Sequence, residues 1–544
     1  MKSAQQDTFI RDQLPPAQAW PEYRFDLPEL QFPEQLNAVV SLLDDAIAKK
    51  GFADHVMLRS PQRNFTYTEA HLVVNRIAAY LVEDCQLVPG NRVLLRGPNS
   101  MGMALCWLAV VKAGLVAVPS MPLLRAKELS EIIHKAQPAL ALCDGQWLAE
   151  LETAQQQTGD ALKRVICFNS EDSSDLGQLC ASKSGEFTAC PTLASDIAMM
   201  AFTSGTTGLP KAAVHLHRDL LAACECWPRH ILQAKSSDIT LGSPPLAFTF
   251  GLGGLLLFPM WAGASVYFHD KAYTPEIMVD VINSVGATIS YTAPTFYRQM
   301  AAFAKAKGTK SLRISVSAGE GLPDATRQLW KEATGLEMLD GIGATEMFHI
   351  FISSAGADVK RGEHGTPIGK VVPGYTAKVV DDEGNELPRG QVGKLAVIGP
   401  TGCKYFADER QKNYVKAGWN YPGDAFLQDA DGYFFYQARA DDMIVSAGYN
   451  IGGPEVEDCL LKHAAVAECA VIGAPDEERG TIVKAFVVLK PGHIGDEAMT
   501  KLLQDHVKAT LAPYKYPRQI EFRSSLPRTE TGKLQRFKLR TLAN

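Results

Sequence analysis

Residues 203–211 read TSGTTGLPK, and the interpretation of the whole chain depends on this stretch. Apolar runs on both sides, IAMMAF (197–202) and AAVHLH (212–217), predict buried strands that the loop connects. Glycines let backbone amides approach an anion, and the hydroxyls and the lysine add donors and a positive charge. We therefore expect a polyphosphate-binding loop, formed by Thr203, Ser204, Gly205, Thr206, Thr207, Gly208 and Lys211.

Two other interpretations of this loop are less favoured. A Walker-type loop has Gly directly before Lys and a helix directly after it, whereas Pro210 precedes Lys211 here and a strand is expected to follow. A polar hairpin turn is also rich in Ser, Thr and Gly. So many hydroxyls, together with two glycines, a proline and a lysine, are more specific than a turn requires.

The composition is that of a soluble globular protein. At 544 residues the chain has room for about three to four domain-sized units. Its net charge of -6 gives no electrostatic reason to expect nucleic acid or an anionic membrane as a partner. Among its 11 cysteines only Cys224 and Cys226 form a close pair, with no second pair for a zinc site, which favours reduced thiols in a cytoplasmic protein.

Residues 241–268 carry no charge and are long enough to span a bilayer. Prolines and glycines interrupt this stretch, and such residues break a continuous helix. We therefore interpret it as buried helix and strand of a soluble domain.

Strands and helices alternate along most of the chain, which predicts parallel sheets covered by helices. Strands are expected at 92–97, 287–294 and 312–320, and helices at 101–113, 126–136 and 275–284. Short strands separated by glycines between about 364 and 440 suggest a small β-barrel-like module. After ARADD (438–442) a smaller α+β unit begins, so we expect a large α/β domain over residues 1–439 and a second domain over 440–544.

Further motifs supply polar groups suited to a nucleotide. In GIGATE (341–346), the Thr345 hydroxyl can meet a phosphate and the Glu346 carboxylate can hold Mg²⁺, although alone the motif would be a turn with a solvated acid. SAGEGLP (317–323) follows an expected strand and offers backbone groups to a flat base.

Three charged side chains near the end of the chain complete this set. Asp424 in YPGDAF (421–426) can accept two ribose hydroxyls, and Arg439 can add a charge-assisted contact. Lys533 lies on a Gly-containing turn in PRTETGKLQR (527–536), where a lone lysine would ordinarily be a surface residue.

Five motifs in this order, TSGTTGLPK, GIGATE, YPGD, ARADDMIVSAG and PRTETGK, resemble the adenylate-forming superfamily of acyl-CoA synthetases, adenylation domains and luciferases. The resemblance covers almost the whole chain. Within the superfamily, DGIGATEMFHIFIS (340–353) and LAPYKYPRQIEF (511–522) look most like benzoate-CoA and 2-aminobenzoate-CoA ligases, and LAFTFGLGG (246–254) fits the latter better.

The resemblance implies a two-step reaction with ATP, Mg²⁺ and coenzyme A: a carboxylate and MgATP give an acyl-adenylate and pyrophosphate, and the CoA thiol then displaces AMP. It assigns the metal to Glu346 and the bridge between carboxylate and α-phosphate to Lys533, with Thr345, Lys211 and the loop on the phosphates. The remaining ATP contacts it implies are Gly319, Glu320, Gly321, Asp340, Gly341, Ile342, Asp424 and Arg439.

The resemblance also implies where the acid binds. In similar aryl-CoA ligases the segment AFTFG (247–251) and the segment after GIGATE form the walls of the acyl pocket. His349 either orients the carboxylate or is a buried histidine satisfied by the backbone. Adenylation domains for amino acids usually have an Asp in this segment that binds the amine, and AFTFG contains none. The expected lining residues are Thr249, Phe250, Gly251, Ile342, Gly343, His349 and Ile350.

In the resembling enzymes a mobile C-terminal domain rotates between the two steps. The hinge would be Asp441, and Gly448 would lie beside the CoA channel. Two departures affect these assignments: Pro422 replaces a Thr that the family usually has before Gly423, and Val445 replaces a Lys or Asn.

Several alternatives stay open at this stage. A stand-alone enzyme could load an aryl acid onto a carrier protein, a CoA ligase could prefer cinnamate or a short fatty acid, and a nucleotide-binding regulator could lack catalysis. The expected partners are a small aromatic carboxylate, ATP and CoA, without nucleic acid or membrane. A homodimer is an open alternative to a monomer.

Overall fold

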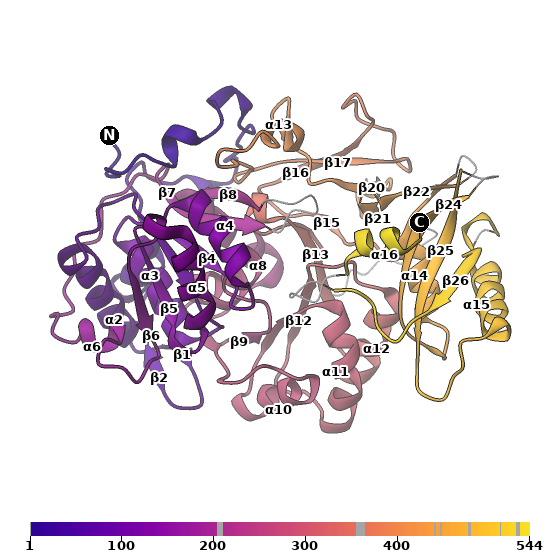
Figure 1. The fold of residues 1–544 in the computed structure, drawn as a ribbon, viewed down its shortest axis with the longest axis horizontal. Coiled ribbons are helices and arrows are strands. Elements are labelled where there is room, and N and C mark those ends of the chain that lie inside the picture. The colour runs from indigo at the N-terminus through magenta and orange to yellow at the C-terminus, as the bar shows by residue number, and fades with distance from the viewer. Residues whose placement is uncertain are drawn as a thin grey trace.

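The structure, a computed structural model, describes residues 2–203, 210–354, 365–439, 442–446, 449–476, 480–511, 513–528 and 534–543. Two α/β sheets and a β-rich sheet make up a large N-terminal unit, and a smaller α+β unit lies beside it (Figure 1). The expected fold class is confirmed. Some expected site residues lie outside the described ranges: Ser204, Gly205, Thr206, Thr207, Gly208, Asp441, Gly448 and Lys533.

The first sheet has the strand order β6-β5-β3-β4-β7-β8, parallel except for the antiparallel edge pair β7 and β8. Successive residues of its central strand β3 face two cores: Val93 and Leu95 pack with helix α3, and Leu94 packs with α4 and α5. The elements are β3 (Arg92–Arg96), α3 (Met101–Lys112), β4 (Val116–Ser120), α4 (Ala126–Ala136), β5 (Leu140–Asp144), α5 (Leu148–Thr158), β6 (Val165–Phe168), β7 (Ile197–Thr203) and β8 (Lys211–Leu216).

The second sheet has the order β15-β14-β13-β12-β11-β9-β10-β1-β2, and helices α10 to α12 lie below it in Figure 1. Its strands from β9 to β13 pair in parallel, so their carboxyl ends meet at one edge. The elements are β1 (Val56–Arg59), β2 (Asn64–Thr66), β9 (Ile239–Gly242), β10 (Ser265–Tyr267), α10 (Pro275–Val285), β11 (Ile289–Thr292), α11 (Pro294–Lys307), β12 (Ile314–Ala318), α12 (Asp324–Thr334), β13 (Met338–Gly343), β14 (Ile350–Ser353) and β15 (Lys370–Val371).

The uncharged stretch 241–268 is buried inside this unit, as expected from its prolines and glycines. It folds as three short consecutive helices between β9 and β10, namely α8 (Thr249–Leu252), η9 (Gly253–Leu257) and α9 (Phe258–Ala262). Among the described residues, no helix is both long enough and apolar enough to cross a membrane.

The β-rich module and the C-terminal unit follow. Strands β16 (Thr376–Val380), β17 (Val392–Ile398), β18 (Val415–Lys416), β19 (Trp419–Asn420), β20 (Asp424–Gln428) and β21 (Phe434–Arg439) form an antiparallel sheet, with α13 (Gln411–Tyr414) beside it. The C-terminal unit contains β22 (Ile444–Ser446), β23 (Tyr449–Ile451), α14 (Gly453–Leu461), β24 (Val466–Asp476), β25 (Gly480–Leu489), α15 (Glu497–Thr510), β26 (Gln519–Phe522) and α16 (Arg536–Ala543). The boundary at residues 439 and 440 stays a prediction.

Residues 401–406, here called the 401–406 segment, join the β-rich module to the first sheet. The segment runs alongside β8: the Val214 amide donates to the Lys404 carbonyl at 2.8 Å, and the Phe406 amide donates to the Ala212 carbonyl at 2.9 Å. The edge of β8 is therefore covered rather than exposed.

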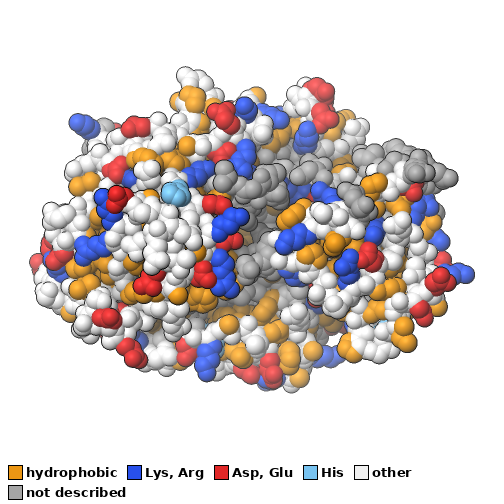
Figure 2. Space-filling view, viewed as in Figure 1, with side chains coloured by type: hydrophobic (Ala, Val, Ile, Leu, Met, Phe, Trp, Pro, Cys, Tyr) orange, Lys and Arg blue, Asp and Glu red, His pale blue; other side chains and the backbone are white. Residues whose placement is uncertain are grey.

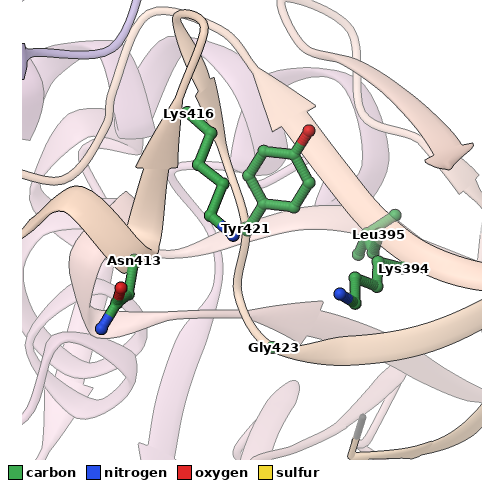
Figure 3. A pocket seen from close by; sticks show the side chains of 6 residues that line it. All are labelled: Lys394, Leu395, Asn413, Lys416, Tyr421 and Gly423. Carbon is green, nitrogen blue, oxygen red and sulfur yellow. The ribbon is translucent and has the colours of Figure 1, made fainter. Parts of the chain in front are cut away.

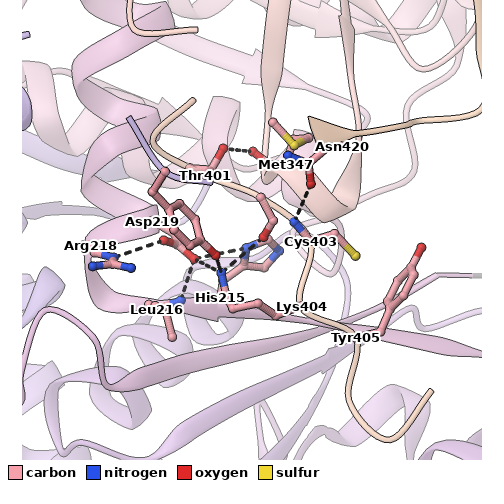
Figure 4. Close-up of polar contacts among 12 residues, drawn as sticks. His215, Leu216, Arg218, Asp219, Met347, Thr401, Cys403, Lys404, Tyr405 and Asn420 are labelled. Atoms are coloured by element: carbon pink, nitrogen blue, oxygen red, sulfur yellow. Dashed lines mark hydrogen bonds and ion pairs between the residues drawn. The ribbon is translucent and has the colours of Figure 1, made fainter. Parts of the chain in front are cut away.

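A buried ion pair holds the same junction (Figure 4). Lys404 Nζ lies 3.1 Å from Asp219 Oδ2 of helix α7 (His217–Trp227), and both side chains are 0% exposed. The ammonium also donates to the Tyr23 hydroxyl at 2.7 Å and to the Gly402 carbonyl at 3.2 Å. Burial alone would lower the pKa of Lys404, but Asp219 and Tyr23 outweigh this and raise it overall.

We predict that Lys404→Met lowers the free energy of unfolding by about 3 to 5 kcal/mol, because it removes the nearest cation from the buried Asp219 carboxylate and leaves only Arg218 Nε at 4.0 Å. Urea-induced unfolding followed by circular dichroism measures this. The matched control is Lys412→Met, since Lys412 pairs with Glu409 at the surface at 3.4 Å and exposed pairs contribute little. Equal midpoints for the two variants would contradict the prediction.

Candidate active site

The expected phosphate loop connects the two edge strands of the first sheet. Thr203 ends β7, Lys211 begins β8, and the two residues pair directly across the hairpin. The loop residues between them, apart from Pro210, lie outside the described ranges. The Pro210 carbonyl accepts a hydrogen bond from Lys135 Nζ at 3.1 Å, so helix α4 supports the end of the loop.

Glu346 and Lys211 come from different sheets, yet both contact Tyr405. Glu346 lies in the short helix η10 (Thr345–Met347), which follows β13, and its side chain is buried. The Tyr405 hydroxyl donates a hydrogen bond to Glu346 Oε1 and lies 3.3 Å from Lys211 Nζ. The sequence motifs did not single out Tyr405. The structure thus brings Glu346 close to Lys211, where the expected phosphate loop ends.

Glu346 is a suitable but incomplete Mg²⁺ ligand. Within the described ranges, no group of three or more His, Cys, Asp or Glu side chains is arranged to hold a metal ion. Mg²⁺ is ordinarily bound by one or two carboxylates together with phosphates and water. A single carboxylate near the expected phosphate loop fits that pattern.

The two segments expected to bind the base lie side by side. Gly319 to Gly321 directly follow β12, and Ala318 of that strand pairs with Gly341 of β13. Both segments therefore lie at the carboxyl ends of parallel strands, where α/β sheets bind ligands. The Asp340 carboxylate is turned to internal partners: it accepts from the Gly341 amide at 2.9 Å and lies 3.3 Å from Arg327 Nη2. Burial raises the pKa of Asp340 to about 6, and Arg327 opposes this.

Asp424 and Arg439 pair across strands β20 and β21. Arg439 Nη1 lies 3.3 Å from Asp424 Oδ1 and donates to the Pro422 carbonyl at 2.9 Å. Pro422 thus contacts the arginine through its backbone carbonyl. Gly423 has φ +86°, and a Cβ there would lie 2.6 Å from Arg439 Nη2, so this turn requires glycine.

Glu320 connects the expected nucleotide site to the C-terminal unit. Its carboxylate accepts from Thr295 Oγ1 at 3.1 Å and lies 3.6 Å from Arg528 Nη1. Arg528 also pairs with Glu468 of β24 at 2.8 Å. In the space-filling view, Lys and Arg side chains lie on both sides of the hollow between the two units (Figure 2).

The expected acyl-pocket residues meet around His349. Thr249 and Phe250 begin helix α8, and the Phe250 ring lies 5.7 Å from the His349 ring. Phe258 and Trp227 complete this aromatic group, at 4.5 and 5.5 Å from His349. Burial lowers the pKa of His349 to about 3, so the imidazole is neutral at physiological pH.

The contacts of His349 bear on its two expected roles, orienting the carboxylate or being satisfied by the backbone. Neither ring nitrogen forms a hydrogen bond with the described residues. The Phe250 backbone lies near enough to oppose the pKa shift in part, but the contact lacks hydrogen-bond geometry. A buried histidine satisfied by the backbone is therefore not what the structure contains.

Glycines allow the walls of this region to pack closely. A Cβ at Gly341 would lie 2.8 Å from Ile350 Cγ2, and one at Gly343 would lie 2.6 Å from the His349 carbonyl. A Cβ at Gly251 would lie 2.1 Å from the Pro245 carbonyl oxygen. Close packing alone therefore favours glycine at these three expected site positions.

Two residues that matter for the shape of this region were not identified from the sequence. The Asn99 side chain accepts from the Leu246 amide at 2.7 Å and donates to the Pro244 carbonyl at 2.8 Å, so it fixes the turn before Thr249. Phe348 has φ +70°, a conformation that L residues rarely adopt, and separates Glu346 from His349. Its buried ring packs edge-on against His215 at 5.2 Å.

A separate pocket of about 180 Å³ opens on the β-rich module (Figure 3). It borders the turn that precedes Asp424 but contains none of the expected acyl-site residues. Its lining residues are Lys394, Leu395, Asn413, Lys416, Tyr421 and Gly423.

Two family models match the chain. The AMP-binding enzyme model covers residues 44–405, and the AMP-binding enzyme C-terminal domain model covers residues 455–533. The chain belongs to the AMP-binding enzyme family. The first match spans both α/β sheets, and the second falls within the C-terminal unit.

Named relatives share nearly the full length of this AMP-binding enzyme. The benzoate–CoA ligase of Thauera aromatica is 34% identical and aligns over 94% of this chain and 97% of its own. The anthranilate CoA ligase AuaEII, solved in complex with anthranoyl-AMP, has a TM-score of 0.89 at 34% identity, covering 95% of this chain and 99% of that chain. A benzoate CoA ligase from Burkholderia xenovorans LB400 has a TM-score of 0.83 at 29% identity, covering 93% and 100%. The resemblance inferred from the five motifs is confirmed.

We predict that the buried, neutral His349 makes the enzyme less stable as the pH falls. The unfolded histidine gains a proton near pH 6.5, whereas the folded one gains it only near pH 3. Below pH 6.5 this group therefore lowers the free energy of unfolding by about 1.4 kcal/mol per pH unit. His349→Gln should reduce the pH slope between pH 6 and 4 by that amount, as measured by urea unfolding at several pH values.

The control for this measurement is His134→Gln, which replaces an exposed histidine in helix α4. Its slope should match that of the unaltered enzyme. A His349→Gln slope that also matches would show that His349 takes up its proton in the folded state.

Proposed function

We propose that this AMP-binding enzyme is an ATP-dependent aryl-CoA ligase that converts benzoate or 2-aminobenzoate to its CoA thioester, releasing AMP and pyrophosphate. The observation that carries the proposal is the aromatic wall around His349 in a chain similar over nearly its full length to an anthranilate CoA ligase and a benzoate–CoA ligase. Aromatic walls suit a benzene ring.

In the first step, a carboxylate oxygen of the acid bonds to the α-phosphorus of ATP, and the bond to the β-phosphate breaks. Negative charge then gathers on the α-phosphate and the departing pyrophosphate. Residues 203–211, with the Thr345 hydroxyl and the Lys211 ammonium, would hold these phosphates. Lys533 would contact the carboxylate and the α-phosphate, since fixed cations stabilise such charge.

The nucleoside would lie at the carboxyl ends of β12 and β13. Gly319, Glu320 and Gly321 would flank one side of the base, and Gly341 and Ile342 the other. Because the Asp340 carboxylate is held by Arg327, its part would be to support this strand end rather than to contact ATP. Asp424 would accept the ribose hydroxyls, with Arg439 beside it.

Mg²⁺ would reach the site together with ATP. When bound, it would neutralise phosphate charge, and Glu346 is the side chain proposed to hold it. The hard carboxylate oxygens of Glu346 fit this ion. The Tyr405 hydrogen bond keeps one of these oxygens at a defined position.

The acid would bind against Thr249, Phe250 and the glycines Gly251 and Gly343, with His349 and Ile350 opposite. A neutral imidazole cannot form an ion pair with the carboxylate, but it can donate or accept one hydrogen bond. His349 would therefore orient a polar group of the acid through a hydrogen bond. Benzoate and 2-aminobenzoate differ by one such group, so this residue is placed to affect the choice between them.

In the second step, the CoA sulfur bonds to the carbonyl carbon of the acyl-adenylate, the bond to AMP breaks, and the thiol loses its proton. We propose that the C-terminal domain, residues 440–544, turns about Asp441 between the steps, which withdraws Lys533 and brings Gly448 beside the thiol. Residues 1–439 would form the fixed domain. A cytoplasmic location remains part of this proposal.

The proposal predicts that purified enzyme with ATP and CoA forms the thioester of benzoate or 2-aminobenzoate. Mass spectrometry of the acyl-CoA and kcat/KM values over a panel of aromatic, cinnamic and short aliphatic acids measure this, with a preference over hexanoate of roughly 10-fold or more. Pyrophosphate exchange without acyl-CoA would indicate a carrier protein as acceptor. A preference for hexanoate would refute the aryl assignment, and absence of AMP release would indicate a regulator.

Separate assays of the two half-reactions test the alternation. We predict that Lys533→Ala slows adenylation by ~10²-fold or more and leaves thioester formation from supplied acyl-adenylate nearly unchanged. Gly448→Leu should show the reverse, and Asp441→Pro should impair the second step by restricting the hinge. Lys538→Ala, on the exposed side of α16, is the control. Equal losses in both steps for Lys533→Ala and Gly448→Leu would indicate one fixed site.

A further inference from the structure

Tyr405 links two residues of the proposed site although it belongs to none of the sequence motifs. Its hydroxyl donates to Glu346 Oε1, and the Lys211 ammonium donates to the Tyr405 hydroxyl oxygen at 3.3 Å. The Tyr405 side chain is fully buried. Its two partners come from the first sheet and from the end of β13, and Tyr405 itself lies in the 401–406 segment that leads to the β-rich module.

The position of Tyr405 is set by protein contacts rather than by a ligand. Its backbone amide donates to Gln411 Oε1 at 2.9 Å, and its backbone pairs with Ala213 of β8. Gln411 Nε2 donates in turn to the Cys403 carbonyl at 3.0 Å. The neighbouring Lys404 forms the buried ion pair with Asp219. Protein contacts alone therefore account for the position of the phenol.

Two opposite charges, those of Glu346 and Lys211, flank the Tyr405 hydroxyl. A carboxylate and an ammonium both contact one neutral hydroxyl, and no ion pair within 4.0 Å joins Lys211 to Glu346 in the described part of the chain. With no hydroxyl between them, the buried Glu346 carboxylate and the half-buried Lys211 ammonium would attract each other directly. Such a pair would occupy the carboxylate that the metal needs and the ammonium that the phosphates need.

We propose that Tyr405 is a positioning residue of the adenylation step, whose hydroxyl keeps Glu346 and Lys211 apart and available to MgATP. This inference rests on the proposed function, in which Glu346 holds the metal and Lys211 the phosphates. Tyr405 does not touch the reacting atoms. It acts through the two charged side chains that it separates.

A matched control lies beside it. Tyr414 packs edge-on against Tyr405, with ring centroids 5.8 Å apart, and it is also buried. The Tyr414 hydroxyl forms no hydrogen bond with the described residues. Tyr405→Phe and Tyr414→Phe therefore remove the same atom from the same cluster, but only the first removes a contact with Glu346.

The experiment measures equilibrium binding of α,β-methylene-ATP, which cannot release pyrophosphate, with and without Mg²⁺. In Tyr405→Phe, we expect the tightening of binding by Mg²⁺ to fall roughly 10- to 100-fold, the range for losing one hydrogen bond to a charged group. Metal-free binding should weaken less than binding with Mg²⁺, because without the metal only the Lys211 ammonium contributes to it. Tyr414→Phe should bind like the unaltered enzyme, and thermal unfolding verifies that both variants are folded.

Half-reaction assays supply a second readout. Tyr405→Phe should slow pyrophosphate exchange but leave thioester formation from supplied acyl-adenylate unchanged, which a general loss of structure would not do. In a Glu346→Gln background, Tyr405→Phe should have little further effect on the Mg²⁺ dependence, because the two residues act together.

The variant Glu346→Gln distinguishes failure of the positioning role of Tyr405 from failure of the proposed metal assignment. If this variant loses the Mg²⁺ effect while Tyr405→Phe behaves like Tyr414→Phe, the positioning role is refuted and the proposed function stands. If Glu346→Gln keeps the full Mg²⁺ effect, the metal assignment within the proposed function is wrong, and the role of Tyr405 falls with it.

Discussion

The backbone pairing between β8 and the 401–406 segment is the constraint on which the rest of the structure depends. It joins the β-rich module to the first sheet through Val214 and Phe406, and the Asp219–Lys404 pair reinforces it. Thr401 extends the junction to the second sheet, since its hydroxyl donates to the Met347 carbonyl at 2.7 Å. Three sheets that are separate in sequence therefore meet at one place, and the proposed metal ligand lies directly beside it.

This convergence explains why the candidate site contains short segments from so many parts of the chain. Each strand contributes only the residue or two at its end, where the backbone leaves the sheet and side chains become available. The proposed phosphate loop connects two edge strands, whereas the segments proposed to bind the base follow the neighbouring parallel strands β12 and β13. The rigid sheets fix the distances between these groups, which is what transition-state stabilisation demands.

The sequence predicted the architecture well because its signals were local. Alternating strands and helices, and the glycines and prolines in 241–268, each carried their own physical reason. Tyr405 was missed because its role depends on contacts with residues far away in the chain, and nothing in CKYFADE marks it. The same holds for Asn99 and for the Arg327 contact of Asp340. Pairing across sheets, rather than local pattern, decides which polar side chains face a ligand.

Phe348 has a consequence for how this enzyme can diversify. Met347 and Phe348 separate the carboxylate at 346 from the imidazole at 349, and Phe348 has the strained backbone and a ring that packs against His215. A substitution at position 349 that shifts the backbone would also change the positive-φ conformation of Phe348. The Glu346 side chain would then point in a different direction. In the proposed function, a change of acid preference at 349 is therefore coupled through the backbone to metal binding at 346. Substitutions on the α8 side of the pocket avoid that coupling, which makes helix α8 the freer route to new substrates.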